Sequence, residues 1–345
     1  MNESLFRDAY KRLNPEQKLA VDTIEGPVMV IAGPGTGKTQ ILTLRIANIL
    51  KQTQVGPENI LALTFTESGA RAMRERLAMY IGAPAYRVGI YTFHEFAGIL
   101  IRTYPDAYTR AVGGRPITDL EKITLIESII ETPTIKLLRP TCIPQFYVKP
   151  IMSALSTMKR EYITPDRFVE IIEEQEKVLN ATEKIHEKGA HKGKVRSEYI
   201  DREKGVNKNR ELLFIYRAYE SELAKNGHFD YDDMIFETVE ALQQNEDMLR
   251  SLQEQYQYIL ADEHQDVNGS QNKILELLAS FHDRPNIFVV GDEKQSIYRF
   301  QGASLENFLY FEEKFPHTKT VALTTNYRSV QEVREFSHAP LTVRA

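Results

Sequence analysis

The sequence of 345 residues contains no tryptophan, a single cysteine and no apolar run long enough to span a bilayer. The lone Cys142 excludes a disulfide within the chain and is typical of proteins from a reducing compartment. The first four residues are polar or acidic after the initiator Met, unlike a secretory signal. We therefore expect a cytoplasmic protein that has no membrane partner.

The chain also lacks an overall excess of positive charge, because its formal net charge is −5 at pH 7. Binding to nucleic acid depends on where charge lies more than on its sum. Residues 184–210 contain nine Lys and Arg residues and four Asp and Glu residues, with three glycines among them. This basic stretch is either a solvated loop or a patch that contacts phosphate groups, and the sequence leaves both interpretations open.

Apolar residues make up 42% of the chain and charged residues 26%, which predicts a packed core. A chain of this length accommodates two domains. Strand and helix patterns alternate along its first part, with strands at 28–31, 60–64 and 88–92 and helices at 40–51, 68–80 and 93–102. Further strands are predicted at 258–261, 287–290 and 320–323. Such alternation is typical of a parallel sheet flanked by helices.

The rhythm changes between residues 119 and 224, where the periodicity is mostly helical and prolines divide the chain into short helices. The sequence therefore predicts an α/β fold, a parallel sheet with helices on both faces, interrupted by an α-helical insertion. We expect the sheet domain to comprise residues 1–104 and 210–330 and the insertion to comprise 105–209. Residues 331–345 are expected to begin a further domain.

A glycine-rich loop follows the first predicted strand directly. It comprises Ala32, Gly33, Pro34, Gly35, Thr36, Gly37, Lys38 and Thr39, and a helix pattern begins at once. Glycines let backbone N–H groups turn toward an anion, and the helix N-terminus adds its positive dipole end. In such a loop Lys38 reaches the β- and γ-phosphates and the Thr39 hydroxyl binds Mg²⁺. The pattern usually opens with glycine, where this chain has Ala32. A chance glycine-rich turn is the alternative, but the flanking strand and helix favour a nucleoside triphosphate site.

Two carboxylates, Asp262 and Glu263, end the predicted strand at 258–261. In an enzyme with a phosphate loop, an Asp at this point holds Mg²⁺. Its neighbour Glu263 can orient the attacking water and accept its proton. Alone, such a pair is often no more than an acidic helix start. Together with the glycine-rich loop, the pair predicts nucleotide hydrolysis.

Two further residues are candidates for stabilising charge on the γ-phosphate. Gln295 follows the strand at 287–290, at the end of a strand where open α/β sheets bind ligands. Arg328 can place its guanidinium on the same phosphate. Its neighbour Tyr327 can stack on the base. Each also has an ordinary alternative, as a surface glutamine, a salt-bridging arginine or a core tyrosine.

Eight segments in order along the chain resemble the motifs of the UvrD/Rep family of superfamily 1A DNA helicases. They are Leu13-Asn14-Pro15-Glu16-Gln17, Ala32 to Thr39, Leu63-Thr64-Phe65-Thr66 with Ala70 and Met73, Tyr91-Thr92-Phe93-His94-Glu95-Phe96, Asp230-Tyr231-Asp232-Asp233-Met234, Asp262-Glu263-His264-Gln265-Asp266, residues 290–303, and Asn326-Tyr327-Arg328-Ser329. The resemblance spans residues 13–329 apart from the helical insertion. It departs from the family at Gln40, where an arginine that packs on adenine is common, and at His264, where an aromatic residue is more usual.

The resemblance implies a RecA-like P-loop NTPase domain that uses ATP and Mg²⁺. It implies that Gln17 reads the adenine and that Asp230 to Met234 mark the return of the chain to the sheet domain. The implied nucleotide contacts are Gln17, the loop from Ala32 to Thr39, Gln40, Tyr327 and Arg328. The implied groups of the reaction are Lys38, Glu263, Gln295 and Arg328, with Thr39 and Asp262 holding the metal ion.

The resemblance also implies that single-stranded DNA crosses the domain. The residues implied in DNA contact are Thr64, Phe65, His94, Tyr298 and Phe300. Stacking of a base on an aromatic face is worth roughly 1–3 kcal/mol whatever the sequence, which suits these aromatic residues. From the residues alone, core packing of Phe65 and Phe300 is the ordinary alternative.

The family implies ATP hydrolysis coupled to 3′-to-5′ movement on single-stranded DNA and to unwinding at junctions with duplex. Its members continue into a second RecA-like domain, so we expect this chain, which stops at Ala345, to be an N-terminal half with little hydrolysis or unwinding of its own. Two alternatives remain open. One is a motor subunit of a helicase–nuclease complex, and the other is a DNA-binding module that binds nucleotide without hydrolysing it. The oligomeric state is not predicted.

Overall fold

The computed structural model describes residues 2–186, 193–292 and 305–327. The chain divides into two compact units, which we call the sheet unit (residues 1–100 and 239–345) and the helical unit (residues 101–238). The expected boundary at 209/210 differs from this division, because the helix α9 (Ser197–Lys225) runs across it without a break. Its second half packs in the core of the helical unit through Ile215, Tyr216 and Tyr219. The insertion therefore extends to residue 238.

The sheet unit contains one parallel sheet of six strands in the order β3-β2-β6-β7-β1-β8. The strands are β1 (Val28–Ala32), β2 (Ile60–Thr64), β3 (Gly89–Thr92), β6 (Tyr258–Ala261), β7 (Ile287–Gly291) and β8 (Lys319–Leu323). Each lies within two residues of a strand predicted from the sequence. The predicted parallel sheet is thus confirmed.

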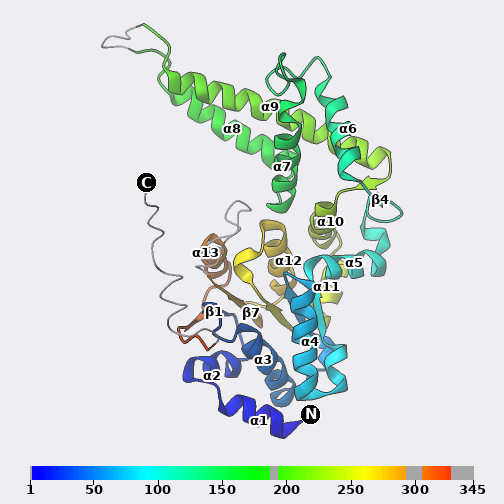
Figure 1. Cartoon of the computed structure of the whole chain (residues 1–345), viewed down its shortest axis with the longest axis vertical. Coiled ribbons are helices and arrows are strands. Elements are labelled where there is room, and N and C mark those ends of the chain that lie inside the picture. The colour runs from blue at the N-terminus through cyan, green and yellow to red at the C-terminus, as the bar shows by residue number, and fades with distance from the viewer. Residues whose placement is uncertain (1, 187–192, 293–304, 328–345) are drawn as a thin grey trace, which may run out of the picture. The chain divides into compact units, whose positions relative to one another are not determined.

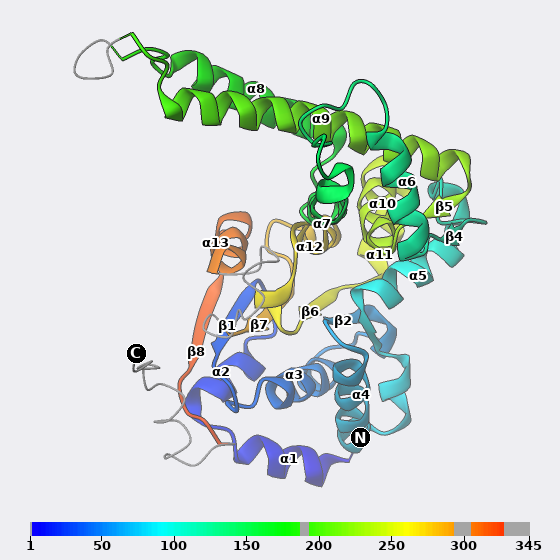
Figure 2. The same cartoon turned by 45° about the horizontal axis from the view of Figure 1, so that its top comes forward.

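The strands are short apolar runs because side chains on both faces of the sheet are buried. In β1, Val28, Val30 and Ala32 pack into one core together with side chains of the surrounding helices. Met29, which points to the opposite face by the two-residue period of a strand, is buried as well. Figure 2 shows the corresponding layers, with α2, α3 and α4 on one side of the strands and α12 on the other.

The helices predicted at 40–51 and 68–80 are confirmed as α3 (Lys38–Gln52) and α4 (Glu67–Ile81). The sheet unit also contains helices for which no bounds were predicted from the sequence, which are α1 (Glu3–Lys11), α2 (Pro15–Asp22), α11 (Glu246–Gln255), α12 (Gly269–Ala279) and α13 (Leu305–Lys314). Two more helices, α5 (Phe93–Thr103) and α10 (Tyr231–Gln244), carry the chain between the units. Polar side chains cap the N-termini of several of these helices. The Thr66 side chain accepts from Gly69 N–H before α4, and Asn268 forms a capping box with Gln271 before α12.

The helical unit contains α6 (Asp119–Ile130), α7 (Val148–Arg160), α8 (Pro165–Ala181) and α9. Figure 1 shows α8 lying along the long helix α9. Two short strands, β4 (Arg115–Pro116) and β5 (His228–Phe229), pair in parallel near the ends of the unit. The expected helical insertion is therefore present, and its core is made of Ile, Leu and Tyr side chains from these helices. Among the described residues, no helix combines the length and apolar character that crossing a membrane requires.

Candidate active site

Three chemically distinctive segments meet at one edge of the sheet. The glycine-rich loop follows β1, the acidic pair follows β6, and Asp292 follows β7. Because β6, β7 and β1 are neighbours and parallel, their carboxyl ends lie at the same edge. This is the edge at which open α/β sheets bind ligands.

The loop after β1 has a backbone that only glycine adopts readily. Gly35 has a φ of 73° and Gly37, the residue that caps α3, has a φ of 92°. Thr36 ties the loop back on itself, since its hydroxyl donates to the Gly33 carbonyl at 2.7 Å. The helix α3 then begins at Lys38, so its N-terminal N–H groups and its positive dipole end adjoin the loop. The arrangement suits an anion such as a phosphate group.

An ion pair joins this loop to the acidic pair. Lys38 Nζ lies 2.8 Å from Glu263 Oε2, and the Lys38 side chain is 11% exposed. The two residues are separated by 225 positions in the chain, so their contact depends on the pairing of β1 and β6 through β7. The predicted proximity of the loop and the acidic pair is therefore present in the structure.

Asp262 is buried at the end of β6 and is 6% exposed. Burial and the adjacent Glu263 raise the pKa of Asp262 to about 7, while Lys38 acts in the opposite direction. A divalent cation would compensate this buried carboxylate, and carboxylate and hydroxyl oxygens are ligands that Mg²⁺ prefers. The described residues contain no cluster of three or more His, Cys, Asp and Glu side chains able to hold a metal. Mg²⁺ binding by Asp262 and Thr39 stays a prediction, in which water and phosphate oxygens supply the other ligands, as is usual for this ion.

Glu263 occupies a strained backbone conformation. Its φ of 50° lies in the left-handed region, which a residue with a side chain adopts only when its surroundings impose it. A single turn of 3₁₀ helix, His264–Asp266, follows it. Within that turn, Gln265 donates from Nε2 to Glu263 Oε2 at 2.8 Å. The sequence analysis gave Gln265 no role, although a polar residue in the turn after paired acids was the signal for one.

Two of the predicted nucleotide residues outside the loop, Gln17 and Tyr327, lie against it. Gln17 is buried, and its Nε2 donates to the Thr36 carbonyl at 2.8 Å while its Oε1 accepts from Asn14 N–H at 3.1 Å. Tyr327 lies against the same loop, because its backbone N–H donates to the Gly35 carbonyl at 2.9 Å. The hydroxyl of Tyr327 accepts from Asn14 Nδ2 at 3.0 Å, and the residue is 60% exposed. Adenine recognition by Gln17 and stacking by Tyr327 stay predictions.

The predicted DNA residues that the structure describes lie at the same sheet edge, after β2 and β3. Phe65 is 40% exposed, whereas Thr64 is 2% exposed and therefore gives little surface to a ligand. His94 is partly buried in the first turn of α5. Of these three, Phe65 offers the most surface for stacking. Gln295, Tyr298, Phe300 and Arg328 lie outside the described residues, and their roles stay predictions.

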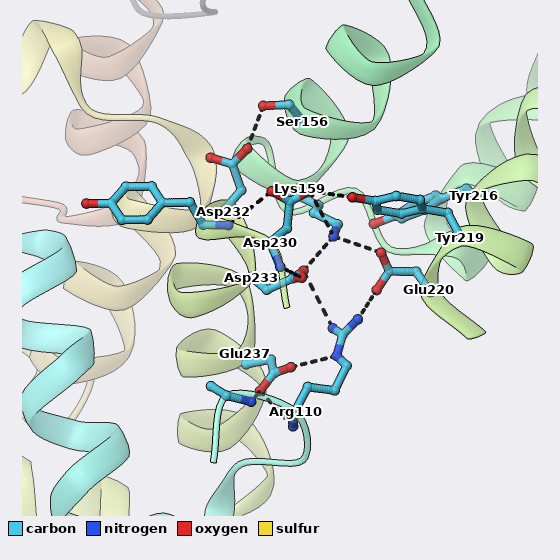
Figure 3. Close-up of polar contacts among 12 residues, drawn as sticks. Arg110, Ser156, Lys159, Tyr216, Tyr219, Glu220, Asp230, Asp232, Asp233 and Glu237 are labelled. Atoms are coloured by element: carbon cyan, nitrogen blue, oxygen red, sulfur yellow. Dashed lines mark hydrogen bonds and ion pairs between the residues drawn. The ribbon is translucent and has the colours of Figure 1, made fainter. Parts of the chain in front are cut away.

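The acidic segment singled out in the sequence, Asp230 to Met234, belongs to the helical unit. Figure 3 shows Asp230 and Asp233 turned toward Lys159, which reaches Asp233 Oδ1 at 2.6 Å. Arg110 joins this network through Asp233 and Glu237. The segment thus forms a buried ion network that holds the helical unit together.

The basic stretch at 184–210 is partly neutralised within the helical unit. Arg202 pairs with Glu198 at 3.0 Å, and Arg210 pairs with Glu176 at 2.7 Å. Lys208 donates to the Tyr147 hydroxyl at 2.8 Å. These contacts favour a solvated helix surface over a dedicated phosphate patch, and residues 187–192 of the stretch lie outside the described part of the chain.

Comparison with known proteins gives a consistent result. Residues 13–316 match the UvrD/REP helicase N-terminal domain family. The chain is similar to the ATP-dependent DNA helicase PcrA of Staphylococcus epidermidis, with 32% identity over 325 residues, covering 94% of this chain and 39% of that protein. It is also similar to PcrA of Leuconostoc citreum (32% over 328 residues, 95% and 38%) and of Staphylococcus aureus (31% over 321 residues, 93% and 38%). The chain thus spans less than half the length of these relatives.

Proposed function

The chain belongs to the family of UvrD/REP helicase N-terminal domains, and we propose that it forms the ATP-binding part of an ATP-dependent DNA helicase. The observation that carries the proposal is the 2.8 Å contact between Lys38 and Glu263, which brings a phosphate loop and a paired-acid turn together. Because the chain covers only 39% of its S. epidermidis relative, the activity of the complete protein is part of the proposal. A cytoplasmic location stays a prediction from composition.

Each residue of the site has a distinct task in the proposed reaction. Lys38 leaves Glu263 and binds the β- and γ-phosphates, which the loop N–H groups also hold. Thr39 and Asp262 would hold Mg²⁺, which when bound draws negative charge from those phosphates. Glu263 then orients a water molecule and accepts its proton as the water attacks. Gln295 and Arg328 are proposed to stabilise the charge that develops on the γ-phosphate.

The order of the strands supports DNA binding beside the nucleotide. The strand β2 pairs in parallel with β6 and β3 pairs in parallel with β2, so Phe65 and His94 lie along the same edge as Asp262. An exposed aromatic ring at this edge suits stacking on bases of any sequence. We therefore propose single-stranded DNA and its junctions with duplex as partners. Movement from 3′ to 5′ and unwinding are proposed for the complete protein.

Titration with a fluorescent ATP analogue in the presence of Mg²⁺ tests the nucleotide site. The wild-type chain should bind, and Lys38→Ala should weaken binding at least about tenfold, because it removes the charge-assisted contact to the phosphates. Lys51→Ala is the matched control, since Lys51 lies in the last turn of the same helix and should leave affinity unchanged. Equal binding by Lys38→Ala and the wild type would contradict the proposal.

A second measurement separates catalysis from binding alone. Glu263→Gln should retain the analogue and remove whatever ATP hydrolysis the wild-type chain shows, since an amide cannot accept the proton of water. For DNA, Phe65→Ala should weaken binding to a single-stranded oligonucleotide by about 1–3 kcal/mol. Tyr86→Ala is its control, because Tyr86 is 70% exposed but precedes β3 at the opposite end of that strand. Equal losses in the two variants would remove Phe65 from the DNA site.

A further inference from the structure

Gln265 is a buried amide whose two ends are both engaged. The residue is 2% exposed, and its Nε2 donates to Glu263 Oε2 at 2.8 Å. Its Oε1 accepts from the backbone N–H of Asp292 at 2.9 Å. Asp292 directly follows β7, whereas Glu263 follows β6. One side chain therefore connects the carboxylate of the acidic turn to the end of the neighbouring strand.

The backbone around this amide is shaped to admit it. A Cβ atom placed on Gly291 would collide with Gln265 Oε1 and would lie 3.0 Å from Gln265 N. Glycine at the end of β7 is therefore needed for Gln265 to approach the strand so closely. The hydrogen bond to Asp292 is a built feature of the site.

The turn that carries Gln265 is braced from α12 and α13. Asn307 Nδ2 donates to the carbonyls of His264 at 3.2 Å and Val267 at 2.6 Å. Asn307 Oδ1 in turn accepts from Asn272 Nδ2 at 2.9 Å. These bonds hold the turn that directly follows Glu263, the residue with a positive φ, so the positions of Glu263 and Gln265 are set together.

Lys38 and Gln265 donate to the same oxygen, Glu263 Oε2. If Lys38 turns to bound phosphates, as the proposed function requires, Gln265 is the described donor that stays on that oxygen. We infer that Gln265 is a positioning residue, which keeps Glu263 oriented and hydrogen-bonded when Lys38 leaves it, and so favours nucleotide binding. The inference rests on the proposed function and assigns Gln265 a role beyond it.

A double-mutant cycle on nucleotide affinity tests this inference. The Kd of a fluorescent ATP analogue with Mg²⁺ is measured for the wild type, Gln265→Met, Glu263→Gln and the double variant. Met has a similar length but donates no hydrogen bond, so Gln265→Met should leave Glu263 dependent on Lys38 and weaken binding by about five- to tenfold. In the Glu263→Gln background, where no charged pair has to break, the same change should alter Kd by less than about twofold.

Gln271→Met is the matched control, because Gln271 is also buried but bonds within the capping box of α12. It should leave Kd unchanged. Equal weakening by Gln265→Met in both backgrounds, or none in either, would overturn the inference, since packing alone would then explain the residue. Even with that result, binding of the analogue by the wild type but not by Lys38→Ala would still support the proposed function.

Hydrogen exchange tests the geometry around Gln265 without nucleotide, so it also applies if the chain does not bind the analogue. Gln265→Met should speed hydrogen exchange of the Asp292 amide in the nucleotide-free chain by about tenfold or more, because its acceptor is removed. Unchanged exchange would overturn the proposed geometry whether or not the chain binds nucleotide. Failure of the wild type to bind the analogue would instead overturn the proposed function, and the inference about nucleotide binding with it.

Discussion

The two units bury a cation by opposite means. Arg45 of the sheet unit and Lys159 of the helical unit are each 1% exposed. Among the described residues, the hydrogen bonds of Arg45 go only to neutral groups. Its acceptors are the backbone carbonyls of Ala20 at 2.8 Å, Ile24 at 3.2 Å and Thr23. Its guanidinium also lies 4.4 Å from the centre of the Phe288 ring. Burial lowers the pKa of Arg45, while the nearby Tyr258 and Glu25 act in the opposite direction and offset this only in part.

Lys159 lies among carboxylates instead. Its Nζ is 2.6 Å from Asp233, 2.8 Å from Glu220 and 3.9 Å from Asp230. Burial alone would lower the pKa of Lys159, but these three acids raise it above its ordinary value. Loss of Lys159 leaves formal negative charges buried, whereas loss of Arg45 leaves only neutral carbonyls without a donor. We therefore expect the free energy of unfolding to fall more when Lys159 is lost.

The largest effect is expected for Lys159→Met, which keeps the length of the side chain and removes its charge. The acids around it would stay buried without their central cation, so the free energy of unfolding should fall by about 3–5 kcal/mol. Denaturant unfolding measures the loss, and hydrogen exchange of α7 and α9 amides assigns it to the helical unit. Lys225→Met, at a 72% exposed side chain of α9, should stay within about 0.5 kcal/mol. Similar values for the two variants would refute the comparison.

The sequence could not have predicted this network. Lys159 stands beside Arg160 near the end of an amphipathic helix, and lysine is almost never fully buried unless it is paired. Its partners lie on α9 and at the start of α10, so only the tertiary fold brings them together. The boundary of the insertion was misplaced for the same reason, since no local break in α9 marks it.

Strands, helices and the phosphate loop were predictable because their signals are local. The run from Val28 to Thr39 contains strand, glycines and helix start in sequence, and the structure reproduces that order. Asp262 and Glu263 were likewise marked by the apolar strand before them. Gln265 was not marked in this way, because its proposed positioning role depends on a hydrogen bond with Asp292. The two residues come together only because β6 pairs with β7.

Arg45→Met should have the second-largest effect. The carbonyls of Ala20, Thr23 and Ile24 would lose their donor, but each is neutral, so we expect a loss of about 1–3 kcal/mol in the free energy of unfolding. Unfolding in denaturant, with hydrogen exchange of α3 amides, measures it in the sheet unit. Arg250→Met, at an exposed helical arginine paired only with Glu246 among the described residues, is the control and should change little. A loss as large as that of Lys159→Met would mean that carbonyl dipoles and carboxylates are equivalent partners.

The two variants should also differ in their dependence on pH. Lys159 lowers the pKa of Asp230 and opposes the rise that burial imposes on the pKa of Asp233. Without Lys159 both pKa values rise in the folded state, which then binds more protons than the unfolded chain as the pH falls. The destabilisation by Lys159→Met should therefore shrink by about 1–2 kcal/mol between pH 8 and pH 5. That of Arg45→Met should change less, because the groups that accept its hydrogen bonds are backbone carbonyls, which do not titrate, and Glu25 is the carboxylate that acts on its charge. Parallel behaviour of the two variants would show that the acids near Lys159 do not respond to its charge.

The smallest effect concerns a buried polar group with neither kind of partner. His264 is fully buried, and neither ring nitrogen is within hydrogen-bond geometry of a partner among the described residues, although the backbone of Asn307 opposes the effect of burial on its pKa. Its ring meets Phe308 and Phe311 edge-on, with centroids 5.8 Å and 5.7 Å away, and burial lowers its pKa to about 4.

A Phe at position 264 keeps an aromatic ring against these neighbours and removes two unsatisfied polar atoms. The larger ring needs some repacking, so we expect His264→Phe to raise the free energy of unfolding by only about 0.5–1 kcal/mol. Thermal and denaturant unfolding measure the gain, and His282→Phe, at an exposed histidine, should give none. A loss of stability in His264→Phe would mean that the imidazole has a hydrogen-bonding partner in solution.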